Sequence, residues 1–473
     1  MDFRLLLKQK WENGGDFPIP SLDIDGVVWS LSDSFDIHQD TIPEYACVSY
    51  VWGSGRAENP IHPSISMSDR TLPVLSAAIR NTEFEAFWVD AFCVPTDPAH
   101  RGPTLESMGY IYSRAKQVVA VLAPRSFAAV KEMSTLQKGD IPSVRLLEDL
   151  ERETWIRSVW TYQEVVNSST TFFVGEDSAD GKLLDCSEFL NALGYYQTKY
   201  REHANITTFD MRTRYPNLDA FEDLMVDWLL AAYTQRSALE IMANMPRRYY
   251  EDPKNYFYSM IGALTQKPSK RSKKPTVEAL AETFMAIAEE KGDYSFIFAS
   301  SPRDRRPGLE WRPKPELLQA IVHWHVDGEA LIGAREPDGI RLKGMTIARR
   351  STAAGSQAKQ TVASWLQAPQ LAESSDDAIA GAMRQVLKKC GFSGSGRHIL
   401  TQHGFTFPQE ELSDDADVEV WLTTDIYYVF GAPAFVVART AEGTRYIPAV
   451  HAGEARGLVG KTDVFLPTGA ARL

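Results

Sequence analysis

The chain has 473 residues, more than one hydrophobic core usually holds, so two or three domains are expected. Hydrophobic residues make up 44% of it and charged residues 24%, a composition typical of globular proteins that fold in water. The formal net charge of −12 argues against nucleic acid as a partner, because a surface that binds a phosphate backbone needs clustered lysine and arginine.

The four cysteines are scattered along the chain and form no CxxC pair. This spacing excludes a disulfide framework and a zinc module, and it favours a reducing compartment, which predicts a cytoplasmic protein. The first residues, MDFRLLLKQKW, contain too short an apolar run for a signal peptide. No segment approaches the roughly 18 consecutive apolar residues of a membrane span, so none is predicted.

The first 180 residues predict an α/β domain. Residues 1–40 indicate a short helix followed by extended chain, and a regular alternation of apolar runs and helical patterns then begins. Because strands alternate with helices at this spacing, we expect a parallel sheet flanked by helices. The expected strands are Tyr45–Tyr50, Phe87–Phe92, Gln117–Leu122 and Thr170–Val174, and the expected helices are Leu72–Arg80, Pro103–Ala115 and Val144–Val166.

Residues 181–300 predict a helical region, and residues 301–473 predict a β-rich C-terminal region. The strongest helical patterns in the middle are Leu218–Thr234, Asp252–Leu264 and Val277–Glu290. After residue 301, short apolar runs are separated by Gly, Asp and Pro, which indicates an antiparallel or barrel-like module. Thr361–Trp365 is one of these predicted strands, and Asp376–Cys390 is the predicted helix among them.

Polar and aromatic residues follow the first two strands of the predicted sheet. Ser49, Tyr50, Trp52 and Gly53 end the first strand, and Asp90 lies within the second apolar run. Ligands of such sheets bind beyond the carboxyl ends of the strands, so a site is expected here. The alternatives are a structural turn with a core tryptophan for the first group, and an Asx turn or helix cap for Asp90.

The segment Trp155–Glu164 (WIRSVWTYQE) is the third candidate. Trp160 and Glu164 are four residues apart, so they share one face of a helix. A carboxylate beside an indole on a mostly apolar helix is costly to bury unless it has a partner or a function. The alternative is that Glu164 is one half of a salt bridge.

Other chemistry is not indicated. The chain contains no GxGxxG, Walker, GxSxG or HExxH motif. His323 and His325 alternate along a predicted strand, and His398 and His403 are five residues apart, but neither pair has a third ligand nearby in the sequence. We therefore predict no metal site and no resident cofactor.

Four blocks in order resemble the fungal heterokaryon incompatibility (HET) domain family. The family patterns are Y-x-A-L-S-Y-x-W-G, W-[IV]-D-A-[LI]-C, M-x-x-I-Y-x-x-A and W-F-x-R-x-W-x-x-Q-E. The corresponding segments here are Tyr45–Gly53, Trp88–Cys93, Met108–Ala115 and Trp155–Glu164. The resemblance covers about residues 40–175, and Asp252–Leu264 is similar to a D-x-x-Y-A-L-L-G-L stretch that follows the domain in many members.

Two positions depart from the family pattern. The family's C-I-N-Q is replaced by Cys93-Val94-Pro95-Thr96, and its arginine before the second tryptophan falls at Ser158, with Arg157 one place earlier. Because one residue turns a helical side chain by about 100°, Arg157 is not expected to replace that arginine.

HET domains are similar in layout to TIR domains, which also have a strand ending in Ser-Tyr and a helix with W-x-x-x-E. In enzymatic TIR domains the glutamate of that helix is the catalytic residue for the cleavage of NAD. Trp160 and Glu164 reproduce the W-x-x-x-E spacing. The resemblance therefore implies a catalytic role for Glu164. The residues that it implies for nucleotide binding are Ser49, Tyr50, Trp52, Gly53, Asp90 and Trp160.

The resemblance implies an effector of non-self recognition and regulated cell death, with NAD glycohydrolase activity, an unknown protein trigger and activation by self-association into a homo-oligomer. One alternative is a non-enzymatic signalling and interaction module in which Glu164 pairs with Arg157 or Arg114 to hold the fold. Another is an enzyme of unrelated activity that keeps the HET scaffold.

Overall fold

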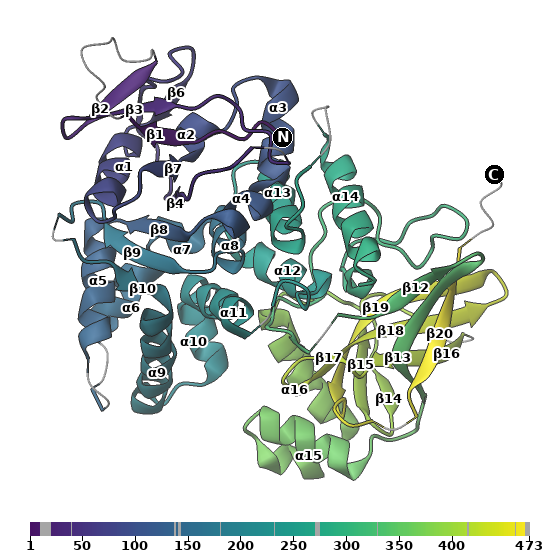
Figure 1. The fold of residues 1–473 in the computed structure, drawn as a ribbon. Helices are drawn as coiled ribbons and strands as arrows, with labels where there is room; N and C mark the ends of the chain where they lie inside the picture. Colours follow the sequence, from purple (N-terminus) through teal and green to yellow (C-terminus); the bar gives the residue numbers. More distant parts are fainter. Residues whose placement is uncertain are drawn as a thin grey trace. The chain divides into compact units, whose positions relative to one another are not determined.

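The computed structural model describes residues 1–9, 20–38, 40–136, 139–140, 143–179, 181–230, 232–269, 275–328, 330–413, 416–458 and 460–468. The chain forms two compact units. The first consists of residues 1–233 and 247–276, and the second of residues 234–246 and 277–473. The α/β class is confirmed, as are the helices in the middle of the chain and the β-rich C-terminal region (Figure 1).

The first unit is built on an eight-stranded sheet of order β10-β9-β8-β4-β7-β1-β3-β2. Its centre is parallel, because β4 pairs with β7 and β8, and β8 pairs with β9, all in parallel register. These central strands are almost wholly buried, as the continuous apolar runs predict. The strands are β1 (Leu6–Lys8), β2 (Ser21–Ile24), β3 (Val27–Leu31), β4 (Ala46–Ser49), β7 (Ala86–Trp88), β8 (Gln117–Leu122), β9 (Thr171–Gly175) and β10 (Leu184–Asp185).

Antiparallel strands border this parallel centre, and the short helix predicted near the N-terminus is wrong. Leu6–Lys8 forms β1, which lies between β7 and β3 and pairs antiparallel with both. Phe3 and Leu6 are buried in the core of this unit. Pairing with strands far along the chain therefore outweighs the weak local preference of three leucines for a helix.

Helices pack on the sheet and on one another. Helix α1 contacts β4, β8 and β9, and helices α5 and α9 contact β9. Helix α8 contacts α4, α11 and α13. The helices of this unit are α1 (Thr71–Arg80), α2 (Asp90–Cys93), α3 (Pro98–Glu106), α4 (Met108–Arg114), α5 (Pro124–Thr135), α6 (Val144–Glu151), α7 (Thr154–Arg157), α8 (Val159–Val166), α9 (Cys186–Ala204), α10 (Thr208–Arg214), α11 (Pro216–Leu230) and α13 (Pro253–Leu264), and a small hairpin is made by β5 (Arg56–Glu58) and β6 (Ser66–Ser68).

The segment Trp155–Glu164 is two short helices rather than one. Helix α7 ends at Arg157, and Ser158 caps α8 by accepting a hydrogen bond from the backbone N–H of Trp160 at 3.3 Å. Tyr249 pairs with the break, because its N–H donates to the Arg157 carbonyl at 2.7 Å and its carbonyl accepts from the Val159 N–H at 3.0 Å. The residue that replaces the family arginine is thus the helix cap of α8.

The second unit contains an antiparallel sheet in the order β12-β13-β16-β18-β19-β15-β14, with β20 paired to β13, and a separate two-stranded sheet of β11 and β17. The strands of this unit are β11 (Asp327–Gly328), β12 (Gly333–Glu336), β13 (Gly339–Arg349), β14 (Ile399–Thr401), β15 (Gly404–Pro408), β16 (Asp417–Thr423), β17 (Ile426–Tyr427), β18 (Gly431–Thr440), β19 (Gly443–Gly453) and β20 (Thr462–Pro467). The antiparallel module predicted from the short apolar runs is confirmed.

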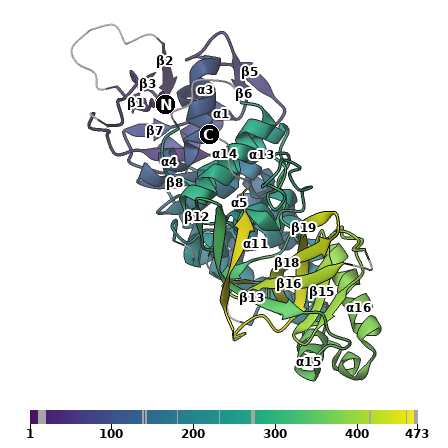
Figure 2. The ribbon, with the colours of Figure 1, turned by 90° about the vertical axis from the view of Figure 1, so that its right-hand side faces the viewer.

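Helices α12 (Ala238–Asn244), α14 (Val277–Glu290), α15 (Ser356–Trp365) and α16 (Asp376–Lys389) belong to the second unit. Both views place α15 and α16 on the same side of its sheet (Figures 1 and 2). The strand predicted at Thr361–Trp365 is wrong, because these residues form the end of α15. Ala358, Val362 and Ala363 make its buried stripe, a spacing of helical period that a five-residue window hides.

Candidate functional site

Ser49 and Glu164 meet at the carboxyl end of the central strand β4. Ser49 is the last residue of β4, and its hydroxyl donates a hydrogen bond to Glu164 Oε2 from α8. The indole Nε1–H of Trp155 donates to Ser49 Oγ at 2.7 Å. Ser49 is 1% exposed and Glu164 is 7% exposed, so this chain of hydrogen bonds is almost completely closed to solvent.

Tyr112 also acts on the same carboxylate. It lies on α4, and its hydroxyl lowers the pKa of Glu164. The ring is fully buried, and Trp88 packs against it edge-on with ring centroids 5.6 Å apart. The Glu164 carboxylate is therefore held from the end of β4 and from α4.

Asp90 forms a second polar group with Trp52 and Tyr50. It is the first residue of α2, directly beyond β7, and its Oδ2 accepts from Trp52 Nε1 at 2.7 Å. The Tyr50 hydroxyl lowers the pKa of Asp90 and lies 2.8 Å from Thr71 Oγ1. Trp52 and Asp90 are only partly buried, so this group lies nearer to solvent than Glu164.

The charge of Asp90 influences the Glu164 carboxyl. The pKa of Glu164 is raised from 4.5 to about 7, chiefly because the group is buried; the negative charge of Asp90 also raises this pKa, whereas Ser49 and Tyr112 lower it. Burial also raises the pKa of Asp90, and the hydrogen bond from Trp52 opposes that effect. A carboxyl group that titrates near neutral pH beside a second carboxylate is a common feature of functional sites.

The loop after β4 is fixed in place. Gly53 has φ +66°, a left-handed conformation that a glycine adopts without strain. Arg70 donates to the Val51 carbonyl at 2.9 Å and forms an ion pair with Glu176 at 2.7 Å. The exposed guanidinium of Arg56 lies over the Trp52 ring, 5.9 Å from its centroid. These contacts fix the loop that carries Trp52.

Trp160 lies on α8 one turn before Glu164, as its spacing predicts. Its partly buried ring is stacked with that of Tyr258 of α13, with an interplanar angle of 15° and a centroid distance of 6.4 Å. Hydrogen bonds therefore connect Ser49 with Glu164, Trp52 with Asp90 and Tyr50 with Thr71, whereas Trp160 is held by a ring contact with the helical region.

The arginines that the salt-bridge alternative requires lie elsewhere. Arg157 is exposed at the end of α7, and Arg114 lies over the Tyr110 ring at 5.5 Å. Within the part of the chain that the structure describes, no ion pair involves Glu164. Hydrogen bonds from neutral groups, rather than a cation, are the partners of this carboxylate.

Two residues of this cluster, Tyr112 and Trp155, were not among the predicted site residues. Tyr112 belongs to the third family block, but its place on the apolar stripe of a helix suggested a core residue. Trp155 begins the fourth block, and nothing in its spacing shows that its indole reaches a strand more than 100 residues earlier. Both residues have a polar group on a large apolar ring, which is the signal that could have indicated them.

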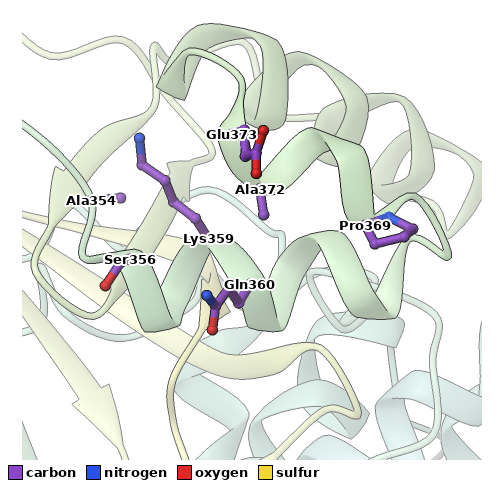
Figure 3. Close-up of a pocket in the computed structure, with 7 residues that line it drawn as sticks. All are labelled: Ala354, Ser356, Lys359, Gln360, Pro369, Ala372 and Glu373. Atoms are coloured by element: carbon purple, nitrogen blue, oxygen red, sulfur yellow. The ribbon is translucent and has the colours of Figure 1, made fainter.

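A hollow in the second unit is lined by residues of α15 and of η3 (Pro369–Glu373), as Figure 3 shows. The predicted site residues all belong to the first unit. Lys359, which lines this hollow, is ion-paired with Asp376 at 2.7 Å. The hollow thus contains none of the residues that carry the predicted chemistry.

The described ranges contain no cluster of three or more His, Cys, Asp or Glu side chains suited to a metal ion. None of the helices in those ranges combines the length and apolar character needed to cross a bilayer. Cys47, Cys93, Cys186 and Cys390 are all free and buried.

Comparison with known proteins gives one match. The family model described as heterokaryon incompatibility protein (HET) matches residues 45–164. No curated protein and no solved structure matches the chain. The matched range starts at the beginning of the first family block and ends at Glu164, so it includes both polar groups of the candidate site. The chain therefore contains a heterokaryon incompatibility (HET) domain at residues 45–164.

Proposed function

We propose that the protein is an effector of the heterokaryon incompatibility type, and that its HET domain cleaves the N-glycosidic bond of an NAD-type nucleotide with Glu164 as the catalytic residue. The observation that carries this proposal is that Glu164, bonded to Ser49, and Asp90, bonded to Trp52, lie at the carboxyl ends of neighbouring parallel strands and that the charge of Asp90 acts on Glu164. In sheets of this kind, that edge is where ligands bind.

The chemistry needs few protein groups. Hydrolysis of the bond between ribose and nicotinamide consumes one water and gives nicotinamide, ADP-ribose and a proton. Nicotinamide leaves as a neutral ring from a cationic substrate, so no general acid is needed. An ionised Glu164 would stabilise the oxocarbenium-like transition state, and its buried position strengthens that electrostatic effect.

The partly exposed group around Asp90 supports the binding of such a nucleotide. An aspartate can accept hydrogen bonds from ribose hydroxyls, and the indole of Trp52 can stack on a planar base. In this proposal Tyr50, Gly53 and Trp160 shape the pocket. The Ser49 hydroxyl accepts a hydrogen bond from Trp155, donates one to Glu164 and is closed to solvent. In this proposal Ser49 therefore acts on the Glu164 carboxylate rather than on the nucleotide.

The biological role is part of the same proposal. The HET domain supports a function in heterokaryon incompatibility. Nucleotide cleavage would cause regulated cell death after non-self recognition, triggered by a protein partner and by association of several copies of the chain.

One observation favours a second function. Glu164 is buried, accepts a hydrogen bond from Ser49 and interacts with the buried Tyr112, an arrangement that also suits a carboxylate whose role is to hold β4, α4 and α8 together. In that case the domain is a non-enzymatic signalling and interaction module.

Nicotinamide release from NAD by the purified full-length protein separates these two functions. The enzyme predicts release by the native protein at high concentration and its loss in Glu164→Gln. Glu44→Gln is the matched control, because the Glu44 side chain is 78% exposed. Absence of release at any protein concentration, together with a folded Glu164→Gln variant that still signals in cells, would support the non-enzymatic module.

A further inference from the structure

We infer that Tyr112 and Trp155 are positioning residues for the Glu164 carboxylate. Trp155 acts by fixing the direction of the Ser49 hydroxyl, and Tyr112 acts through its own buried hydroxyl, which favours the ionised carboxylate. The importance of this arrangement for catalysis rests on the proposed function, whereas the arrangement itself can be tested in a protein without activity.

The direction of the hydrogen-bond chain follows from the chemistry of its members. An indole Nε1–H can only donate, so Ser49 Oγ must accept from Trp155 at 2.7 Å. The single hydroxyl proton of Ser49 is then directed at Glu164 Oε2. Trp155 thereby occupies one acceptor site of the Ser49 hydroxyl and leaves its proton free for the carboxylate, which favours the ionised form of Glu164.

Packing prevents rearrangement of these side chains. Tyr112 and Trp155 are each 1% exposed, so water cannot replace either donor. The Trp155 ring packs edge-on against Phe173, with centroids 5.5 Å apart, and against Phe221 at 5.8 Å. Side chains confined in this way hold a reacting group in a fixed position without further loss of freedom when substrate binds.

The titratable groups that face Glu164 come from three elements. They are Cys47 of β4, Asp90 at the start of α2 and Tyr112 of α4. Burial raises the pKa of Cys47 and of Tyr112 well above their ordinary values, so both are neutral near pH 7. Asp90 is then the charged neighbour, and it disfavours ionisation of Glu164. The donors from Ser49 and Tyr112 offset this repulsion.

The test is the pH midpoint at which Glu164 ionises, followed by infrared or carbon NMR signals of its carboxyl group in the full-length protein. The signal is assigned by its absence in Glu164→Gln. Tyr112→Phe and Ser49→Ala should each raise the midpoint by about one pH unit, because each removes a donor to the ionised form. Trp155→Phe should raise it by a smaller amount, since the Ser49 hydroxyl remains but can turn away.

Tyr45→Phe is the matched control for a buried tyrosine. Its hydroxyl donates to the Ile111 carbonyl at 2.6 Å, on the same helix as Tyr112. This variant should lose stability as Tyr112→Phe does, while the Glu164 midpoint stays unchanged. An unchanged midpoint in folded Tyr112→Phe and Trp155→Phe, or an equal shift in Tyr45→Phe, would overturn the inference.

Nicotinamide release provides the second readout. If the protein cleaves NAD, the acidic limb of its pH profile should move to higher pH in Tyr112→Phe and Trp155→Phe, with a larger effect on kcat than on KM. An acidic limb at the same pH in these variants would count against the positioning role of Tyr112 and Trp155, but not against the proposed cleavage of NAD. Absence of release with shifted midpoints would refute the proposed activity and leave the positioning role supported.

Discussion

The Glu164 carboxylate is subject to opposing effects that can be assigned to individual residues. Burial and the negative charge of Asp90 favour its protonated form, and the donors Ser49 and Tyr112 favour its ionised form. The balance places its pKa at about 7, where a small change in any neighbour changes the charge at neutral pH. Substitutions around this carboxylate should therefore have pH-dependent effects of predictable sign.

Glu164→Gln should change the pH dependence of stability. The pKa of Glu164 is raised from 4.5 to about 7, so the folded state binds the proton more tightly than the unfolded chain. The free energy of unfolding of the native protein therefore falls as pH rises through this range, by about 3 kcal/mol at 1.36 kcal/mol per unit. Glutamine lacks this titration. In urea unfolding, the free energy of unfolding should decrease less between pH 5 and pH 8 for the variant than for the native protein. An equal decrease in the two proteins would contradict the assignment of this titration to Glu164.

Asp90→Asn should act in the direction opposite to Tyr112→Phe. Removal of the neighbouring negative charge lowers the pKa of Glu164, so its ionisation midpoint and the acidic limb of any activity should move to lower pH. The variant retains an acceptor oxygen for the Trp52 indole, which preserves the loop. An unchanged ionisation midpoint of Glu164 in Asp90→Asn, followed by infrared or carbon NMR, would show that the charge of Asp90 does not act on Glu164.

For single residues, the sequence indicates which side chains lie together at the ends of the parallel strands, but it does not indicate the hydrogen bonds around Glu164. Ser49 and Asp90 could be placed at the same edge because parallel strands end together, and Glu164 because of its block. Tyr112 and Trp155 could not be distinguished from core aromatics, since their polar atoms find partners only after α4, α7 and β4 have packed.

Two glycines set the packing of the elements behind the site. A Cβ on Gly109 of α4 would overlap the carbonyl oxygen of Gly262 of α13, and a Cβ on Gly262 would overlap the side chain of Gln163 of α8. These helices can therefore approach closely only because neither position carries a side chain.

Gly109→Ala should lower the free energy of unfolding by about 1–3 kcal/mol, because the backbone of α13 has to move away. Gly194→Ala in α9 is the control. Its Cβ would meet nothing closer than Glu222 at 3.5 Å, so the better helix propensity of alanine should stabilise by about 0.5–1 kcal/mol. Chemical denaturation measures the free energy of unfolding of both variants. Equal changes at the two positions would contradict the role of Gly109 in the close approach of α4 and α13.

Element prediction succeeded where a pattern is long and local. Gln117–Leu122 was predicted with the bounds it has as β8, and Val277–Glu290 with those of α14. It failed at Leu6–Lys8, where pairing with β3 and β7 determines the strand, and at Thr361–Trp365, where too few residues show the helical period. The break at Ser158 also depends on a distant residue, because Tyr249 pairs with it.

At the scale of the molecule, the HET domain depends on chain beyond its family match. The first compact unit continues to residue 233 and also includes residues 247–276. Within it, α8 packs against α11 and α13. The predicted boundary near residue 180 separates α8 from both of these helices. A fragment limited to the predicted domain would therefore lack two of the helices that pack against α8, in which seven of the eight residues are buried in the intact chain.

A fragment of residues 1–180 should accordingly fail to fold as a monomer. The loss of α11 and α13 exposes the buried side of α8 and removes the pairing of Tyr249 with the helix break. Size-exclusion chromatography and thermal unfolding followed by circular dichroism should show aggregation or a broad transition, compared with one or more cooperative transitions of the full chain. A cooperative, monomeric fragment would show that residues 1–180 are sufficient for the fold.

The most direct test of Glu164 as the catalytic residue is nicotinamide release from NAD by the full-length protein, compared between native protein and Glu164→Gln over a range of pH and protein concentration. Release by the native protein should rise through about pH 7, as Glu164 ionises, and the folded variant should release no nicotinamide. Release that is equal in the two proteins, or absent from the native protein in every oligomeric state, would contradict a catalytic role for Glu164.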